Sequence, residues 1–213
     1  MTRLSRWIKD PFCGVSHFVG ALLAIAALIV LLVLADGRPW HVVGFSIYGA
    51  TLILLYVAST LCHSIHCAPR TANRLDKLDH FAIFLLIAGT YTPICLVALR
   101  GPVGWTLLGL EWCLAAVGIV ILSRGPVGHW PRVIIYVAMS WLVLIAVGPI
   151  WRALTPGAIA WLIAGGIIYT GGAVIYTMDR PHLWPGKFAA HDLWHVFVLA
   201  GSACHFVAML SFV

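Results

Sequence analysis

The chain has 213 residues, of which 62% are hydrophobic and only 9% are charged, and its mean hydropathy is +1.00. A soluble domain carries about 25% charged residues, so this composition excludes a water-soluble globular protein and indicates lipid as the surrounding solvent. The formal net charge of +6 does not indicate a nucleic-acid partner, because the basic residues are scattered in short segments between apolar runs.

Seven apolar segments follow one another along the chain, separated by short polar or Pro/Gly-containing stretches. Each is close to the roughly 20 residues that a helix needs to cross a bilayer, and none alternates as a strand of a lipid-facing barrel does. The pattern predicts an all-α membrane protein, a seven-transmembrane helix bundle that forms a single domain over residues 1–213. The expected spans are 12–35, 41–65, 78–99, 103–122, 132–150, 156–177 and 189–212.

The Lys and Arg residues predict the orientation of the bundle, because cytoplasmic loops carry an excess of them. A cytoplasmic N-terminus puts ten of these residues inside and three outside, so we expect the N-terminus inside and the C-terminus outside. The ten are Arg3, Arg6, Lys9, Arg70, Arg74, Lys77, Arg124, Arg132, Arg180 and Lys187, and the three are Arg38, Arg100 and Arg152.

Polar and ionisable residues from three separate stretches fall at one depth. Ser59 and His63 lie near the inner end of the second span, Asp79 opens the third, and His191 and His195 open the seventh. Ionisable groups inside a membrane are costly and usually face the interior of the bundle. The topology was counted from Lys and Arg alone, so this agreement in depth independently indicates a shared site.

The spacing of these residues favours a metal site. His191 and His195 are four apart, which puts both rings on one helix face, where they can bind one ion. His63 is the best candidate for a third ligand, and three histidines leave zinc the open position of a catalytic site. Zinc can lower the pKa of bound water to about 7 and polarise a carbonyl. Asp79 would orient or deprotonate that water, and Ser59 would hydrogen-bond the water or the developing oxyanion.

The stretch TLCHSIHC, residues 60–67, has two Cys and two His, but a metal site made from it alone is disfavoured. Adjacent residues on a helix point about 100° apart, so a closed local site would need the helix to break. We expect Cys62 to pack, Cys67 to be an interfacial thiol, and His66 to be solvated or to contact a ligand. The remaining cysteines fall mostly in or beside apolar runs, where they behave as small hydrophobes.

Several polar residues in the spans have a structural explanation. His17 and His80 are expected to be hydrogen-bonded residues of the core, although His80 could also support a ligand. Glu111 lies in the fourth span, far from the proposed zinc. An intramembrane carboxylate is a functional candidate, but we favour a protonated group hydrogen-bonded to a neighbouring helix.

Two other functions would use the same residues, and the haem-binding one fits their spacing less well. A non-catalytic zinc protein would use Ser59 or Asp79 to close the site, and it would bind a ligand or perturb membranes without turnover. A haem protein would need histidines on facing helices above and below a planar ring, and an i, i+4 pair on one helix suits a small ion better.

The residues of the predicted site also carry a resemblance to a known family. The stretches STLCH (59–63), KLDHFAIFLLIAGTYTP (77–93) and HDLWHVFVLAGSACHF (191–206) resemble the hemolysin III family of bacterial membrane proteins. SHFVG (16–20) and RPHLWPGKF (180–188) are similar to further stretches of that family. These proteins belong with the progestin and adipoQ receptors, in the CREST group of membrane hydrolases.

The resemblance implies a seven-helix bundle in a bacterial cell (inner) membrane, with Zn²⁺ near the cytoplasmic face. It implies His63, His191 and His195 as zinc ligands, with Ser59 and Asp79 close by. The adiponectin receptors are similar proteins linked to ceramide hydrolysis. The expected partners are therefore the lipid bilayer and a lipid substrate or ligand, and the expected reaction is hydrolysis of a lipid amide or ester.

Overall fold

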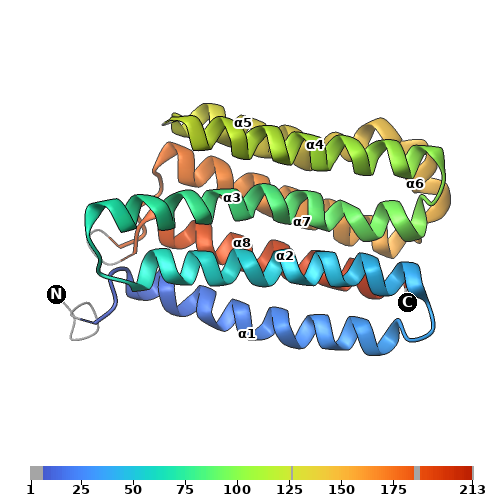
Figure 1. The fold of residues 1–213 in the computed structure, drawn as a ribbon, viewed down its shortest axis with the longest axis horizontal. Coiled ribbons are helices and arrows are strands. Elements are labelled where there is room, and N and C mark those ends of the chain that lie inside the picture. The colour runs from blue at the N-terminus through green and yellow to red at the C-terminus, as the bar shows by residue number, and fades with distance from the viewer. Residues whose placement is uncertain (1–6, 126, 185–187, 213) are drawn as a thin grey trace.

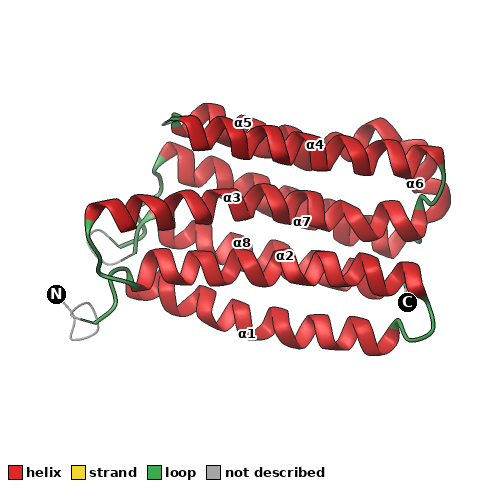
Figure 2. Cartoon of the chain, in the orientation of Figure 1, coloured by secondary structure: helices red, strands yellow, loops and turns green. Residues whose placement is uncertain are grey.

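The computed structural model describes residues 7–125, 127–184 and 188–212, which are almost entirely helical (Figure 2). Among these residues, seven helical segments are long and apolar enough to cross a membrane, which agrees in number with the seven expected spans. They are α1 Pro11–Leu34, α2 Pro39–Ser64, α3 Pro69–Pro93 with a π-helical extension to Ala98, α4 Pro102–Arg124, α5 His129–Ser140 continued through α6 Val147–Ala153, α7 Pro156–Met178 and α8 Ala190–Leu210.

Proline begins most of these helices. Its fixed φ suits the first turn, where its missing N–H leaves no intrahelical bond unmade. In α3 this start lies nine residues before the expected boundary at 78, because the polar stretch before the apolar span is also helical. Hydropathy detects the span and not the helix, so Asp79 stands in the third turn of α3 and not in its first. The helices that begin with proline are α1, α2, α3, α4 and α7.

The bundle closes on itself. Helix α1 packs along α2, α2 along α3, and α3 against α4 and α5, while α7 packs along α8 and α8 returns to α1. Figure 1 shows that the start of α1, the end of α2 and the starts of α3 and α8 lie at the same end of the bundle. Chain segments that are far apart in sequence therefore meet at that end, which is also the end nearest the N-terminus.

The fifth span is interrupted at its centre. Helix α5 ends at Ser140, and a 3₁₀ segment, Leu142–Ala146, joins it to α6. Tyr91 of α3 supplies the partners that the break requires: its hydroxyl accepts a hydrogen bond from the Val143 N–H at 2.8 Å and lies 2.9 Å from the Ser140 carbonyl oxygen. Irregular backbone at membrane depth is tolerated only where the protein satisfies it in this way.

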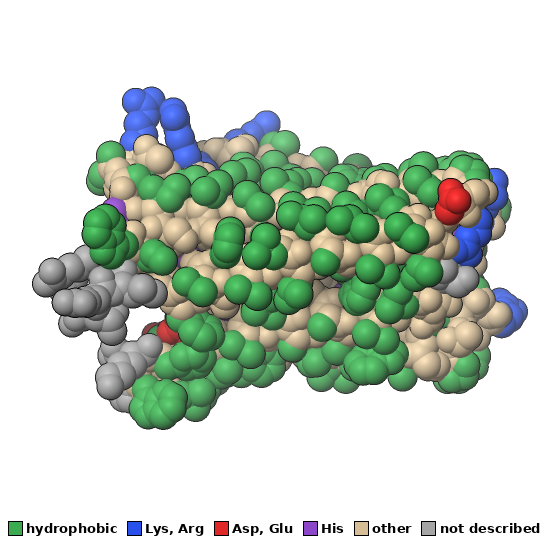
Figure 3. Space-filling view, turned by 90° about the horizontal axis from the view of Figure 1, so that it is seen from below, with side chains coloured by type: hydrophobic (Ala, Val, Ile, Leu, Met, Phe, Trp, Pro, Cys, Tyr) green, Lys and Arg blue, Asp and Glu red, His purple; other side chains and the backbone are tan. Residues whose placement is uncertain are grey.

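The outer surface of the bundle fits a lipid environment. Figure 3 shows hydrophobic side chains along the face between the two ends, with Lys and Arg gathered at the ends. Large apolar side chains such as Ile29, Val33, Ile134 and Ile167 are more than half exposed, as expected for a surface that faces lipid. Of the basic residues used to predict orientation, Arg3, Arg6 and Lys187 lie outside the described residues.

Candidate metal centre

Three histidines meet where the last turn of α2 adjoins the first turns of α8. The centroid of the His63 ring lies 5.0 Å from that of His191 and 4.8 Å from that of His195. The centroids of His191 and His195 are 5.0 Å apart. His63 and His195 are buried and His191 is partly buried. Helix α1 packs against both α2 and α8, and this end of the bundle thus brings together all three residues expected to be ligands.

The nitrogen positions suit a small ion. The Nε2 atoms of His191 and His195 face each other at 3.1 Å. Zn–N bonds of 2.0–2.1 Å in a tetrahedral site put two ligand nitrogens about 3.3–3.4 Å apart, so little movement would let both bind one ion. Nδ1 of His195 is buried without a hydrogen-bond partner among the described residues. A single metal ion is the simplest group that would use the two Nε2 atoms together.

Asp79 and Ser59 lie on the α3 side of the histidines. An Asp79 carboxylate oxygen is 3.9 Å from Nε2 of His63, and the Ser59 side chain lies against the same carboxyl group. Ser59 is buried, and the Asp79 side chain is 17% exposed. The structure therefore puts the Asp79 carboxylate and the Ser59 hydroxyl beside the histidine cluster, as the shared depth of these residues predicts.

A cysteine that sequence reasoning missed joins the cluster. Cys13 in the first turn of α1 can offer its sulfur to a group with His63, His191 and His195 in which all four ligand atoms lie within 4.8 Å of one another. Its thiol donates a hydrogen bond to the Asp192 carboxylate at 3.2 Å. Cys13 follows three basic residues at the start of an apolar run, where a thiol gives the same signal as any small hydrophobe. Its position at the inner end of the first span was the only available clue.

Asp10 is the second residue that the sequence did not reveal. Its carboxylate lies 3.0 Å from Nδ1 of His63, and its backbone N–H donates to the His63 carbonyl oxygen at 2.8 Å. A carboxylate that accepts from one ring nitrogen fixes the tautomer and leaves the other nitrogen free to bind a metal. Asp10 precedes α1, outside the apolar run, so a search of the spans passes over it.

The local quartet in TLCHSIHC does not form. Helix α2 ends at Ser64, and both His66 and Cys67 are exposed in the following loop. Cys62 is buried and forms a different group with His63 and Asp79 whose ligand atoms also lie within 4.8 Å of one another. Of the four Cys and His residues in this stretch, only Cys62 and His63 face the interior.

The other intramembrane polar residues differ in their partners. Nδ1 of His80 lies 2.7 Å from the Asp76 carbonyl oxygen, as expected for a hydrogen-bonded histidine. His17 is buried with its ring centroid 3.9 Å from that of His195, yet neither of its nitrogens has a hydrogen-bond partner among the described residues. Glu111 is fully buried, but neither of its carboxyl oxygens has the expected hydrogen-bond partner among the described residues.

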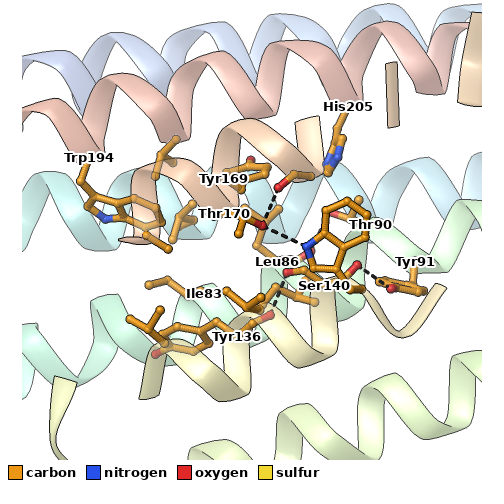
Figure 4. A pocket seen from close by; sticks show the side chains of 18 of the residues that line it. Ile83, Leu86, Thr90, Tyr91, Tyr136, Ser140, Tyr169, Thr170, Trp194 and His205 are labelled. Carbon is orange, nitrogen blue, oxygen red and sulfur yellow. Dashed lines mark hydrogen bonds between the residues drawn. The ribbon is translucent and has the colours of Figure 1, made fainter. Parts of the chain in front are cut away.

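A long cavity of about 290 Å³ opens from this cluster into the bundle. The three histidines, Ser59 and Asp79 line one end, and its walls come mainly from α3, α5, α7 and α8. On α3 the lining residues run from 76 to 94, which is about 27 Å of helix at 1.5 Å per residue. Figure 4 shows the apolar and aromatic side chains around it, among them Ile83, Leu86, Tyr136, Tyr169 and Trp194.

Comparison with known proteins identifies the family. A family model described as "Haemolysin-III related" matches residues 5–206. The chain is 42% identical to hemolysin-3 of Bacillus cereus over 218 residues, which cover 100% of this chain and 96% of that protein. It is 40% identical to the hemolysin-3 homolog of Bacillus subtilis (strain 168) over 213 residues, 96% of this chain and 95% of the relative.

More distant similarity reaches a human protein. The chain is 26% identical to the monocyte to macrophage differentiation factor of Homo sapiens over 178 residues, 81% of this chain and 71% of that protein. The family match covers nearly all of the described spans and both halves of the histidine cluster. The similarity therefore extends over the helical bundle and the candidate site together, and the chain belongs to the haemolysin-III family of multi-pass membrane proteins.

Proposed function

We propose that this protein is a zinc-dependent hydrolase of a lipid amide or ester, similar in its reaction to a ceramidase. The observation that carries the proposal is the meeting of three histidines, a carboxylate and a hydroxyl at one end of a long apolar cavity. His63, His191 and His195 would hold the ion. Imidazole nitrogens suit zinc, and three of them leave the metal a position for water or substrate.

Zinc bound at these residues would polarise a carbonyl and lower the pKa of water to about 7. Asp79 would accept the proton that water loses when it attacks the carbonyl carbon, and would return it to the leaving amine or alcohol. Ser59, lying against the Asp79 carboxyl group, orients that carboxylate or donates to the developing oxyanion.

The cavity supports an acyl chain as the bound part of the substrate. Its α3 wall, about 27 Å long, has nearly the 30 Å thickness of the hydrocarbon core of a bilayer, so an extended acyl chain can lie along it. The excess of Lys and Arg at the metal end supports a cytoplasmic position for that end. A polar head would then reach the site from the cytoplasm, while the tail lies in the bundle of a bacterial inner membrane.

Product release tests the proposed reaction. Purified protein in detergent, loaded with zinc, is incubated with long-chain N-acyl amides and with matched esters, and free fatty acid is measured by mass spectrometry. We expect release from at least one series, loss of release after a chelator, and recovery when zinc is restored. Folded, zinc-loaded protein that releases fatty acid from neither series would contradict the hydrolase.

A second function is supported by the position of Cys13. A sulfur beside three histidines can complete four protein ligands, as in a structural zinc site, and such a protein would be receptor-like or would perturb membranes without turnover. Two relatives carry the name hemolysin-3, which agrees with membrane perturbation. Leakage of a dye from phospholipid vesicles without any fatty-acid release would favour this alternative.

The Asp10 contact predicts a change in metal affinity. Asn in place of Asp10 keeps the size of the side chain but loses the charge that accepts the Nδ1–H of His63. Loss of such a carboxylate partner typically weakens metal binding by about 10–100-fold. We expect Asp10→Asn to lower zinc affinity within this range, measured by competition with a chromophoric chelator. Asp36→Asn, an exposed position at the opposite end of α1, is the matched control and should bind zinc as the wild type does.

A further inference from the structure

We propose that Cys13 is a ligand of the same metal ion, so that the centre is a Cys–His₃ site and not a three-histidine site. The proposal rests on the metal centre proposed above and adds a ligand of different chemistry to it. A thiolate is a good zinc ligand, with a Zn–S bond of about 2.3 Å. It also brings a negative charge that three neutral imidazoles do not supply.

The local packing holds Cys13 in place beside the histidines. The backbone N–H of Asp10 donates to the His63 carbonyl oxygen at 2.8 Å, and that of Lys9 donates to the Ser64 carbonyl oxygen at 3.3 Å. These bonds tie the start of α1 to the end of α2. Gly14 allows the close approach, since a Cβ atom there would lie 2.5 Å from Oγ of Ser64. Cys13, which is only 2% exposed, is therefore fixed at the edge of the cluster.

The chemistry of the thiol is consistent with ligation. Its sulfur and the three histidine nitrogens lie within 4.8 Å of one another, so modest side-chain movement would bring all four to bonding distance of one ion. The Cys13 S–H now donates to the Asp192 carboxylate at 3.2 Å. On ligation a metal–sulfur bond replaces the S–H bond, and the proton is released to water, as in metal binding by cysteine generally.

Ligation by Cys13 is compatible with a reaction in the cavity. His63, His191, His195, Ser59 and Asp79 line the cavity, whereas Cys13 is not among the described residues that do so. The sulfur therefore approaches the cluster from the α1 side, and the side toward the carboxylate and the hydroxyl is left for substrate. Four protein ligands fill a tetrahedral zinc site, so turnover at a Cys–His₃ centre would require a fifth position for water or substrate, such as catalytic zinc sites form in the transition state.

The alternative sulfur is Cys62, which sits beside His63 in the sequence. It groups with His63 and Asp79, and not with the histidines of α8. Both cysteines are buried, so the same change to serine should disturb packing to a comparable extent at each position. Cys62→Ser is therefore a matched control for Cys13→Ser.

Cobalt substitution tests the ligand directly, without an activity assay. Metal-free protein in detergent is loaded with Co²⁺, and its absorption spectrum is recorded. We expect a near-ultraviolet sulfur-to-cobalt charge-transfer band in the wild type, its loss in Cys13→Ser, and its retention in Cys62→Ser. The wild-type spectrum is informative even if a variant fails to fold.

The contrary outcomes are separable. Cobalt bound by the wild type without a sulfur band would exclude Cys13 as a ligand while leaving the three-histidine centre intact. A band lost in Cys62→Ser and kept in Cys13→Ser would show that Cys62 supplies the sulfur ligand, which would contradict the proposal. Wild type that binds no cobalt and no zinc would overturn the metal centre of the proposed function, and the Cys13 ligand with it.

Discussion

Zinc content should fall from about one ion per chain to near zero in a His191→Ala variant purified in detergent. His191 and His195 are one turn apart at the start of α8, with their Nε2 atoms 3.1 Å apart. Removing His191 leaves a single histidine ligand on α8. The remaining ligands then bind zinc with much lower affinity. Elemental analysis of the purified protein measures the loss directly. His63→Ala should behave in the same way, because this histidine alone links α2 to the ion.

His205→Ala is the matched control for these variants. His205 lies on the same helix, ten residues after His195 and thus about 15 Å away, so its loss should leave zinc in place. Zinc kept in His63→Ala but lost in His191→Ala would remove α2 from the centre, since His66 is exposed beyond the end of that helix. Well-folded wild type without zinc would exclude the hydrolase mechanism.

Fatty-acid release should fall by about 10²–10⁴-fold in Asp79→Asn, with zinc still bound, because this is the usual contribution of a positioned general base. Asn has nearly the shape of Asp but cannot accept the proton of the attacking water. Asp79 lies 3.9 Å from Nε2 of His63 and against Ser59, so we expect it to act beside the proposed ion without binding it. The measurement is the rate of release together with the zinc content of the same preparation.

Asp76→Asn controls for the loss of one negative charge near this end of α3. Its side chain is 56% exposed, and its carboxylate lies 3.7 Å from Nδ1 of His80. The closer contact of that nitrogen, at 2.7 Å, is to the Asp76 backbone carbonyl, which the substitution retains. We expect Asp76→Asn to keep most of the activity. An equal fall in both variants would point to a general effect of charge, and loss of zinc from Asp79→Asn would make Asp79 a ligand.

The sequence alone determined the bundle and part of the candidate site. Seven spans could be predicted because a run of about 20 apolar residues indicates a membrane-spanning helix, whichever helices pack against it. The pairing of His191 and His195 could be predicted because i and i+4 share a face of any helix. Their meeting with His63 depended on depth in the membrane, which the counted Lys and Arg predict without knowledge of packing.

Only the tertiary structure decided which side chains surround these histidines. The contact between Asp10 and His63 and the approach of Cys13 depend on α1 packing against both α2 and α8, and helix order in the chain does not specify that neighbour. The break in the fifth span is also invisible in the sequence, because Tyr91 of another helix satisfies the freed backbone groups. Apolar periodicity reports which residues avoid water, whereas partners across helices follow from the fit of their surfaces, and that fit exists only once the bundle has assembled.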